Sequence, residues 1–467
     1  METASEGQKV ATGEVARGFR KRDAFATGLG VLTATLGSAV GLGNIWKFPA
    51  MTGQNGGAAF IIVYLFCTLL VGLPVMMSEH MLGRRARKDA INTMRDLAPR
   101  RQPWWLIGAA GGLAAFLIMA FYSEVAGWVF AYVFKAASGS ILSTDPATNS
   151  ASFGALVSDP WQALLWQWIV LIWVGAIIMM GVSKGIERVT KKLLPLLFVL
   201  LIAVCVRSLT LDGAGEGIKF LFNPDFSKVT GPVVLAAMGL AFFKLSVGMG
   251  TMITYGSYFK EDQNIPATAT KVMLADLTVS ILAGLAIFPA VFALGFDVAA
   301  GPSLLFEIIP AVFASMPGGD FFVIIFFLLT AIAATGAMIS IVEVPVAFLT
   351  EQFRLSRQTA TLLTLGLLAL VGAPAALSFS ELSETSIFGK TFFDLYDYAS
   401  SNILLPVGGL FICIFIGWVW GFDNVKRALS NDGALNNQGI VALFFTVVKY
   451  ITPLLVLLVL LDGLNIL

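Results

Sequence analysis

Two clusters of glycines lie inside long apolar stretches of the sequence. One is Gly37-Ser-Ala-Val-Gly-Leu-Gly-Asn44, and the other is Leu245-Ser-Val-Gly-Met-Gly250. Each glycine in a helix interior costs about 1 kcal/mol relative to alanine, so such clusters favour local unwinding. Unwound backbone offers N–H groups to a carboxylate and carbonyl groups to a cation. The chemistry that these residues suggest is the binding of a small zwitterion by main-chain groups.

The same glycines have a second interpretation, in which they only let neighbouring helices pack closely. Unwound backbone at membrane depth is tolerated only where it lines a protein cavity. Because the clusters fall in corresponding places of two five-span halves, they are typical of an inverted-repeat transporter.

The elements that must position these clusters are membrane-spanning helices. Of the 467 residues, 57% are hydrophobic and 13% are charged, which is the composition of a membrane protein. A bilayer core of roughly 30 Å needs about 20 apolar residues per helix. We therefore expect an all-α membrane protein with about eleven spans, near residues 24–52, 57–83, 104–136, 162–182, 188–208, 231–258, 268–296, 319–350, 359–377, 394–419 and 441–463.

Lysine and arginine collect on one side of the expected spans. They are frequent in residues 84–101, whereas residues 137–163 contain neither. The positive-inside rule therefore predicts a cytoplasmic N-terminus. The expected organisation is a cytoplasmic tail (1–23), a first five-helix repeat (24–208), an extracellular connection (209–230), a second five-helix repeat (231–419), and a cytoplasmic loop with an eleventh helix (420–467). The apolar segment 297–318 is interpreted either as a cap of short helices or as a partly buried linker.

Other classes of function find little support. The net charge of +1 comes with no basic stripe, so we expect no nucleic-acid partner. His80 is the single histidine, and Cys67, Cys205 and Cys413 lie too far apart to suggest a disulfide framework or a metal site. No nucleophile–base pair or phosphate-binding loop appears, so we expect neither an enzyme nor a resident cofactor.

Three segments carry a resemblance to a known family. Gly37 to Pro49 followed by Asn55-Gly-Gly-Ala58, Leu245 to Tyr258, and Ser183-Lys-Gly-Ile-Glu-Arg188 are similar to the signatures of the neurotransmitter:sodium symporters. The resemblance implies the LeuT fold, a 5+5 inverted repeat with discontinuous helices 1 and 6, and amino-acid transport by alternating access. The eleven-span form resembles bacterial members, which implies a bacterial inner membrane and a monomer or weak homodimer.

The resemblance also implies a substrate site. The zwitterion would meet the backbone at Ala39 to Gly43 and at Phe243 to Ser246, and Tyr122 would donate its hydroxyl to the carboxylate. Phe243 would also close over the substrate. Met249 and the small Ala337 suggest room for a neutral, medium to large side chain. The residues implied at this site are Ala39, Leu42, Gly43, Ile118, Tyr122, Phe243, Lys244, Ser246, Met249, Ala337 and Ile341.

Two pairs resemble the family's gates. Lys47 and Asp397 correspond to the outer pair, with lysine where arginine is common, so a point charge replaces a bidentate fork. Arg22 and Glu351 correspond to the inner pair, with Tyr258 alongside. Phe25 stands where a tryptophan commonly closes the cytoplasmic side.

The two sodium positions of the family are altered in this sequence. The first involves Ala39, Asn44, Lys244 and Asp276, and Lys244 would repel Na⁺ in a low-dielectric site. The simplest interpretation is that Lys244 replaces the ion, pairs with Asp276 and meets the substrate carboxylate; a purely structural pair is the alternative. The second position involves Gly37, Val40, Ala333, Gly336 and Ala337, which lack the usual hydroxyls, and Thr335 faces it only with a local bulge.

We therefore hypothesise that coupling to sodium is weak or absent, and that Lys244 is a fixed cation or exchanges a proton. Chloride binding is expected to be poor, with Ser280 and Leu240 at that position. Glu79 and Glu343 are expected to link helices, and Glu124 is either a proton relay or a structural carboxyl. The alternatives are a sodium-coupled symporter with altered sites, a passive channel and a non-transporting amino-acid sensor.

Overall fold

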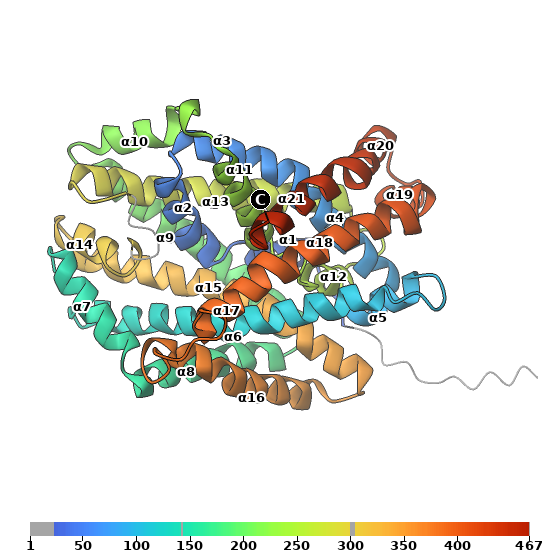
Figure 1. Cartoon of the computed structure of the whole chain (residues 1–467), viewed down its shortest axis with the longest axis horizontal. Helices are drawn as coiled ribbons and strands as arrows, with labels where there is room; N and C mark the ends of the chain where they lie inside the picture. The colour runs from blue at the N-terminus through green and yellow to red at the C-terminus, as the bar shows by residue number, and fades with distance from the viewer. Residues whose placement is uncertain (1–22, 142, 299–303, 467) are drawn as a thin grey trace, which may run out of the picture.

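The regular structure is helical throughout the residues that the computed structural model describes, which are 23–141, 143–298 and 304–466, apart from an isolated β-bridge between Ile387 and Lys390. Most long helices run in one direction, horizontally in Figure 1. The short helices α7 (Pro146–Val157) and α14 (Ile308–Ala314) lie at one end, and α5 (Ala90–Leu97) and α19 (Phe422–Leu429) at the other. We name these the α7/α14 end and the α5/α19 end.

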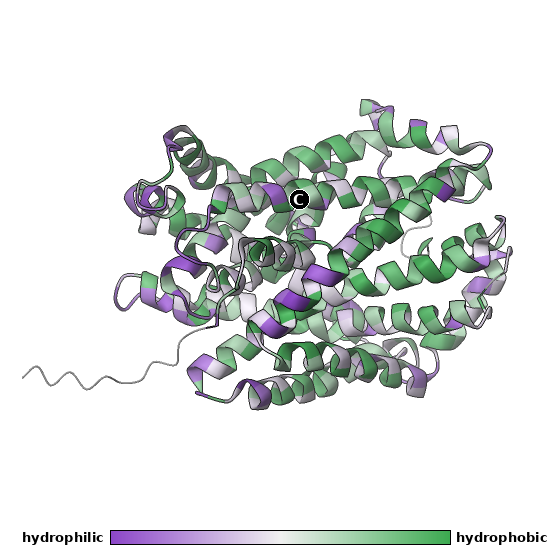
Figure 2. Ribbon diagram, turned by 180° about the vertical axis from the view of Figure 1, so that it is seen from behind, coloured by the Kyte–Doolittle hydropathy of each residue, from purple (hydrophilic) through white to green (hydrophobic). Residues whose placement is uncertain are grey.

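Nine helices within the described residues are long and apolar enough to cross a membrane. Hydrophobic residues cover most of their lengths, and hydrophilic ones are frequent at the two ends and in a few stretches near the middle of the view (Figure 2). The prediction of a multi-pass, all-α membrane protein is thereby confirmed. The nine are Ala58–Ala86 (α3, η2 and α4), Trp105–Ala137 (α6), Pro160–Met179 (α8), Val182–Leu209 (η3 and α9), Ile265–Ala293 (α13), Gly319–Gln352 (α15), Arg357–Phe379 (α16 and η6), Phe392–Trp420 (α17, η7, α18 and η8) and Gln438–Gly463 (α20, η9 and α21).

Two further spans are broken at the glycine clusters. Helix α1 (Gly28–Ala39) stops before η1 (Gly43–Lys47) and α2 (Phe48–Gln54), and the chain bends there by 50°. Helix α11 (Gly231–Lys244) is separated from α12 (Thr251–Gly256) by six non-helical residues, 245–250. The expected discontinuity of helices 1 and 6 is confirmed.

The break after α11 owes its shape to residues with positive φ. Ser246, Gly248 and Gly250 have φ of +52°, +80° and +73°. Glycine adopts these angles without steric cost, whereas most side chains do not. A Cβ added to Gly248 would also lie 2.4 Å from the carbonyl oxygen of Leu405, at the start of α18 (Leu405–Ile414). The break is therefore packed against a neighbouring span.

The two longest helices form the centre of the protein. Helices α6 and α15 pack against each other, and α1 packs against α15, α9 (Arg188–Leu209) and α13. Helix α14 packs on α7 and α15, and Phe306 just before it is buried. This part of segment 297–318 is a helical cap, while Pro302 lies outside the described residues. The unbroken helices thus form the frame that holds the two broken ones.

Replacing Gly248 with alanine tests whether the break depends on this backbone. We expect Gly248→Ala to destabilise the protein by about 2–4 kcal/mol, because it combines an unfavourable φ with a steric clash. The measurement is thermal unfolding of purified protein in detergent. Gly366→Ala is the matched control, because no atom lies within 4 Å of an added Cβ there. Equal melting temperatures for both variants would contradict the expectation.

Candidate functional site

A small cavity of about 20 Å³ lies between the two broken helices and the central pair α6 and α15. Every residue implied for the substrate site lines it except Leu42. Ser38 and Gly41 line it in addition. The full set is Ser38, Ala39, Gly41, Gly43, Ile118, Tyr122, Phe243, Lys244, Ser246, Met249, Ala337 and Ile341.

Side chains satisfy part of the backbone that the break in helix 1 frees. The Tyr122 hydroxyl, on α6, accepts a hydrogen bond from the Leu42 N–H at 3.1 Å. The Asn44 side-chain oxygen accepts one from the Gly41 N–H at 3.2 Å. Leu42 therefore contributes to the site through its main-chain N–H group, and its side chain does not line the cavity. Backbone groups at membrane depth need such partners, because lipid offers none.

The break after α11 is satisfied in the same way. The Ser246 hydroxyl donates to the Ser38 carbonyl at 2.9 Å, which joins the two breaks directly. The Gly248 N–H donates to the carboxylate of Glu79, on α4 (Leu73–Ala86), at 2.6 Å. The expected role of Glu79 as a link between helices agrees with this contact. The two unwound segments are thus fixed to each other and to the frame.

At the first ion position, the ammonium of Lys244 lies among the oxygen atoms. Lys244 Nζ is 3.0 Å from the Asp276 carboxylate, and both side chains are fully buried. Ser280 also accepts a hydrogen bond from Lys244. The Asn44 amide donates to Asp276 at 2.6 Å and to Ser280 at 3.1 Å. These oxygens are already committed to a cation, so this set of residues does not fit Na⁺.

Two aromatic rings complete the surroundings of Lys244. Its Nζ lies 4.8 Å from the ring centroid of Phe48 and 4.7 Å from that of Tyr64. The Tyr64 hydroxyl donates to Asp276 at 3.4 Å. Sequence reasoning missed Tyr64, although a hydroxyl within the apolar run of α3 (Ala58–Cys67) was an available signal. It also placed Ser280 at a chloride position and missed its bond to Lys244.

At the second ion position, Thr330, Thr335 and Ser340 of α15 donate their hydroxyls to carbonyls of α15 itself and not to α1. A Cβ added to Gly336 would lie 2.7 Å from the Gly37 carbonyl oxygen, so the two backbones touch. The Thr335 hydroxyl donates to the Ala331 carbonyl at 2.8 Å and accepts from the Trp173 indole at 3.2 Å. Thr335 therefore points toward α8, as its helical phase dictates.

The implied outer gate pair does not form an ion pair. Among the described residues, the partner of the Lys47 ammonium is the ring of Phe243, whose centroid is 4.1 Å away. The Asp397 carboxylate accepts a hydrogen bond from Ser401 at 2.7 Å. Lys47 thus holds Phe243 over the cavity by a cation–π contact.

A group of aromatic rings closes the α7/α14 end. Trp128, on α6, lies 5.2 Å from Phe153, 5.9 Å from Phe306, 5.4 Å from Phe379 and 6.0 Å from Phe393, measured between ring centroids. We name these five residues the Trp128 cluster. Its members come from α6, α7, α17 (Phe392–Asp397), η6 (Leu377–Phe379) and the segment before α14. The cluster therefore joins elements that are far apart in the chain.

The α5/α19 end is closed by a different set of contacts. The Tyr258 hydroxyl donates to Glu343 at 2.6 Å, and Arg357 pairs with the same carboxylate at 2.6 Å. Phe25 is buried, and its ring centroid lies 5.9 Å from that of Tyr258. The implied inner gate is described only in part, because Arg22 lies outside the described residues. The Glu351 carboxylate accepts a hydrogen bond from the Asp89 N–H at 2.8 Å.

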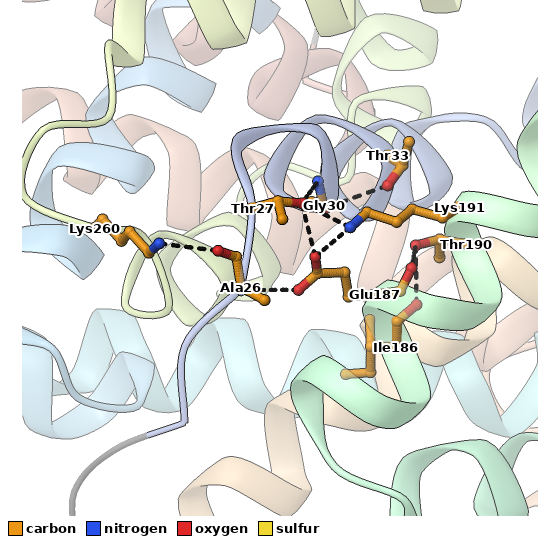
Figure 3. Close-up of polar contacts among 9 residues, drawn as sticks. All are labelled: Ala26, Thr27, Gly30, Thr33, Ile186, Glu187, Thr190, Lys191 and Lys260. Atoms are coloured by element: carbon orange, nitrogen blue, oxygen red, sulfur yellow. Dashed lines mark hydrogen bonds and ion pairs between the residues drawn. The ribbon is translucent and has the colours of Figure 1, made fainter.

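Glu187 fastens the start of α1 to α9, as Figure 3 shows. Its carboxylate accepts from the Ala26 N–H at 2.6 Å and the Thr27 hydroxyl at 2.9 Å, and Lys191 pairs with it at 2.5 Å. An added Cβ on Gly30 would lie 2.1 Å from a Glu187 oxygen, so α1 packs directly on the carboxylate. Glu187 belongs to the third motif of the sequence, for which sequence reasoning gave no role.

Comparisons with known proteins agree with this geometry. The sodium:neurotransmitter symporter family matches residues 22–151 and 152–466. An uncharacterised sodium-dependent transporter of Bacillus subtilis, YhdH, is 40% identical over 95% of this chain and 98% of its own, and one of Haemophilus influenzae is 35% identical over 95% and 99%. The sodium- and chloride-dependent taurine transporter of the dog is 26% identical over 88% of this chain and 73% of its own.

A solved structure gives the same result for the fold. The crystal structure of MhsT in complex with L-phenylalanine matches with a TM-score of 0.87 and 42% identity, over 95% of this chain and 100% of that one. The all-helical fold with two broken helices is therefore the LeuT fold. Together, the motifs, the fold and the relatives show that this chain is a membrane transporter belonging to the sodium:neurotransmitter symporter family.

Proposed function

We propose that the protein carries neutral amino acids with medium to large side chains across a bacterial inner membrane by alternating access. The observation that carries the proposal is the cavity between two unwound segments, which presents main-chain N–H and carbonyl groups beside the Tyr122 hydroxyl. The presence of L-phenylalanine in MhsT, a relative at 42% identity, supports this class of substrate.

The cavity has one polar and one apolar part. The substrate carboxylate binds near Tyr122 and the N–H groups that begin η1, where the helix dipole favours an anion. The ammonium binds at carbonyl groups of the two breaks. The side chain lies against Ile118, Met249 and Ile341, with Phe243 above it.

The ammonium of Lys244 takes the place of the first sodium ion. Its charge is held by Asp276 and Ser280 in this closed state, so it attracts the carboxylate across a short distance instead of by direct contact. Transport then does not need sodium at this position. The second candidate is a sodium-coupled symporter with altered sites, which the names of the two bacterial relatives favour.

Alternating access requires the two ends to open in turn. Because basic residues cluster in the segment 84–101 around α5 and also occur on α19, we place the α5/α19 end in the cytoplasm and the α7/α14 end outside. The Trp128 cluster and the Lys47–Phe243 contact then form the outer closure. The contacts of Glu343 and Glu187 form the inner closure. In this scheme, residues 24–208 and 231–419 are the two inverted repeats.

Counterflow of labelled L-phenylalanine in proteoliposomes tests both parts of the proposal. We expect exchange across the membrane when sodium is replaced by an inert cation, because Lys244 already supplies the positive charge. Absence of counterflow with every neutral amino acid, with or without sodium, would exclude a carrier. Counterflow that needs sodium would instead support the sodium-coupled alternative.

A double-mutant cycle tests the buried pair. We expect Lys244→Met and Asp276→Leu each to lower the free energy of unfolding by about 3–5 kcal/mol, since each leaves a buried charge without its partner. The double variant should recover much of this loss and still fail to bind phenylalanine. Unfolding in detergent and a binding assay provide the two measurements. Additive losses of stability would contradict a direct interaction between the two side chains.

Removing the Tyr122 hydroxyl tests carboxylate binding. We expect Tyr122→Phe to weaken phenylalanine binding about ten- to hundredfold, because it removes a hydrogen bond to a charged group. Isothermal titration calorimetry measures the effect. Tyr450→Phe is the control, because Tyr450 lies on the exposed surface of the last span. An unchanged affinity in Tyr122→Phe would place the carboxylate elsewhere.

A further inference from the structure

Glu124 is a buried carboxyl that the proposed substrate site does not use. It lies on α6, two residues after Tyr122, and its side chain is almost fully buried. One oxygen accepts a hydrogen bond from the Trp128 indole at 2.6 Å. The other oxygen has no hydrogen-bond partner in the part of the chain that the structure describes.

Two other carboxyls buried beside the site pair with cations, Asp276 with Lys244 and Glu343 with Arg357. Glu79 has no such cation among the described residues, and one of its oxygens also lacks a hydrogen-bond partner there, but its carboxyl faces several backbone amides, those of Gly248 and of the start of α12. Glu124 has a single neutral indole. An ionised carboxyl without a counter-charge is costly inside a membrane protein, so Glu124 carries a proton in this closed state.

The charged groups of the helices around α6 do not change this conclusion. The cations on those helices are Arg95, which bonds Asn92, and Arg357, which pairs with Glu343, and α6 itself carries Lys135, which donates to the Ser152 carbonyl. The carboxyls on them are Asp96, Asp320, Glu343, Glu351, Asp394 and Asp397. No ion pair reaches Glu124 from any described residue, and further carboxyls nearby only disfavour a second negative charge.

The partner of Glu124 belongs to the closure of the α7/α14 end. Trp128 is the central ring of the Trp128 cluster, so parting the cluster moves the group to which Glu124 is bonded. Water then reaches the carboxyl and stabilises its ionised form. Closure of this end and protonation of Glu124 therefore favour each other.

We propose that Glu124 binds the proton that travels with the amino acid, which rests on the carrier function proposed above. With the α7/α14 end open, a hydronium ion transfers its proton to the free carboxylate oxygen, so that its own O–H bond breaks, the carboxyl O–H bond forms and a water molecule leaves. Closure of the Trp128 cluster then buries the neutral acid. The same O–H bond breaks when water reaches the carboxyl from the other side. The free energy of the proton gradient thereby drives the accumulation of the amino acid.

Proteoliposomes in sodium-free buffer provide the test, with labelled phenylalanine as the probe. Glu124→Gln keeps an acceptor for the Trp128 indole and cannot ionise. We expect the wild type to accumulate phenylalanine about tenfold when the outside is about tenfold more acidic, and the variant to reach only the equilibrium level. Counterflow at equal pH should stay near the wild-type rate in the variant. Glu384→Gln, at an exposed loop position, is the matched control and should behave as the wild type.

Each other result has a defined meaning. Acid-driven accumulation by Glu124→Gln at the wild-type level overturns the assignment of the proton to Glu124, while the carrier function stands. Net uptake of phenylalanine by the wild type without proton entry, followed with a pH-sensitive dye, overturns it as well. Absence of counterflow in the wild type instead rejects the carrier function itself. If the variant also loses counterflow, the affinity of the purified proteins for phenylalanine is measured at several pH values. The proposal is supported if the affinity of the wild type rises as the pH falls while that of the variant stays constant. It is overturned if the two affinities depend on pH in the same way.

Discussion

Every main-chain N–H and carbonyl group inside a bilayer needs a partner within the protein, and this requirement shapes the centre of the molecule. Two helices give up part of their own hydrogen bonding, and side chains from other helices replace it. Tyr122 reaches the first break from α6, and Glu79 reaches the second from α4. The Ser246 hydroxyl joins the second break to the Ser38 carbonyl of the first. The polar surface that receives a substrate is therefore held in place before the substrate arrives.

The same centre contains a buried side-chain cation, the ammonium of Lys244. Asn44, Asp276 and Ser280 form one hydrogen-bonded set around the Lys244 ammonium, and the rings of Phe48 and Tyr64 lie on it. These groups come from η1, α2, α3, α11 and α13. An ion that binds and leaves allows such elements to separate during a transport cycle. A lysine fixed at the end of α11 keeps them joined more permanently, which makes this region part of the frame.

Much of the site could be predicted from the sequence. The chemistry of the glycine clusters indicated the two breaks, and the family resemblance implied the residues around them together with Ile118, Tyr122, Ala337 and Ile341, which line one cavity. Contacts between segments that are far apart in the sequence were harder to predict. Lys47 lies on the ring of Phe243 and does not reach Asp397, because the position of a long flexible side chain depends on which end is closed. The direction of the Thr335 side chain follows from its position around the helix, and an error of one residue in the alignment would change that prediction. Tyr64 was not predicted because it is a single hydroxyl within an apolar helix.

A cation that is part of the chain differs from a dissolved one in what it contributes to the energetics of a cycle. A sodium ion crosses with its cargo, and each elementary charge that moves through 100 mV changes the free energy by about 2.3 kcal/mol. The Lys244 ammonium stays attached to α11 and remains paired with Asp276. In the carrier function proposed above, a zwitterion passing this position carries no net charge with it. The membrane voltage then does no work there, and concentration of the substrate draws on a gradient that acts elsewhere in the protein.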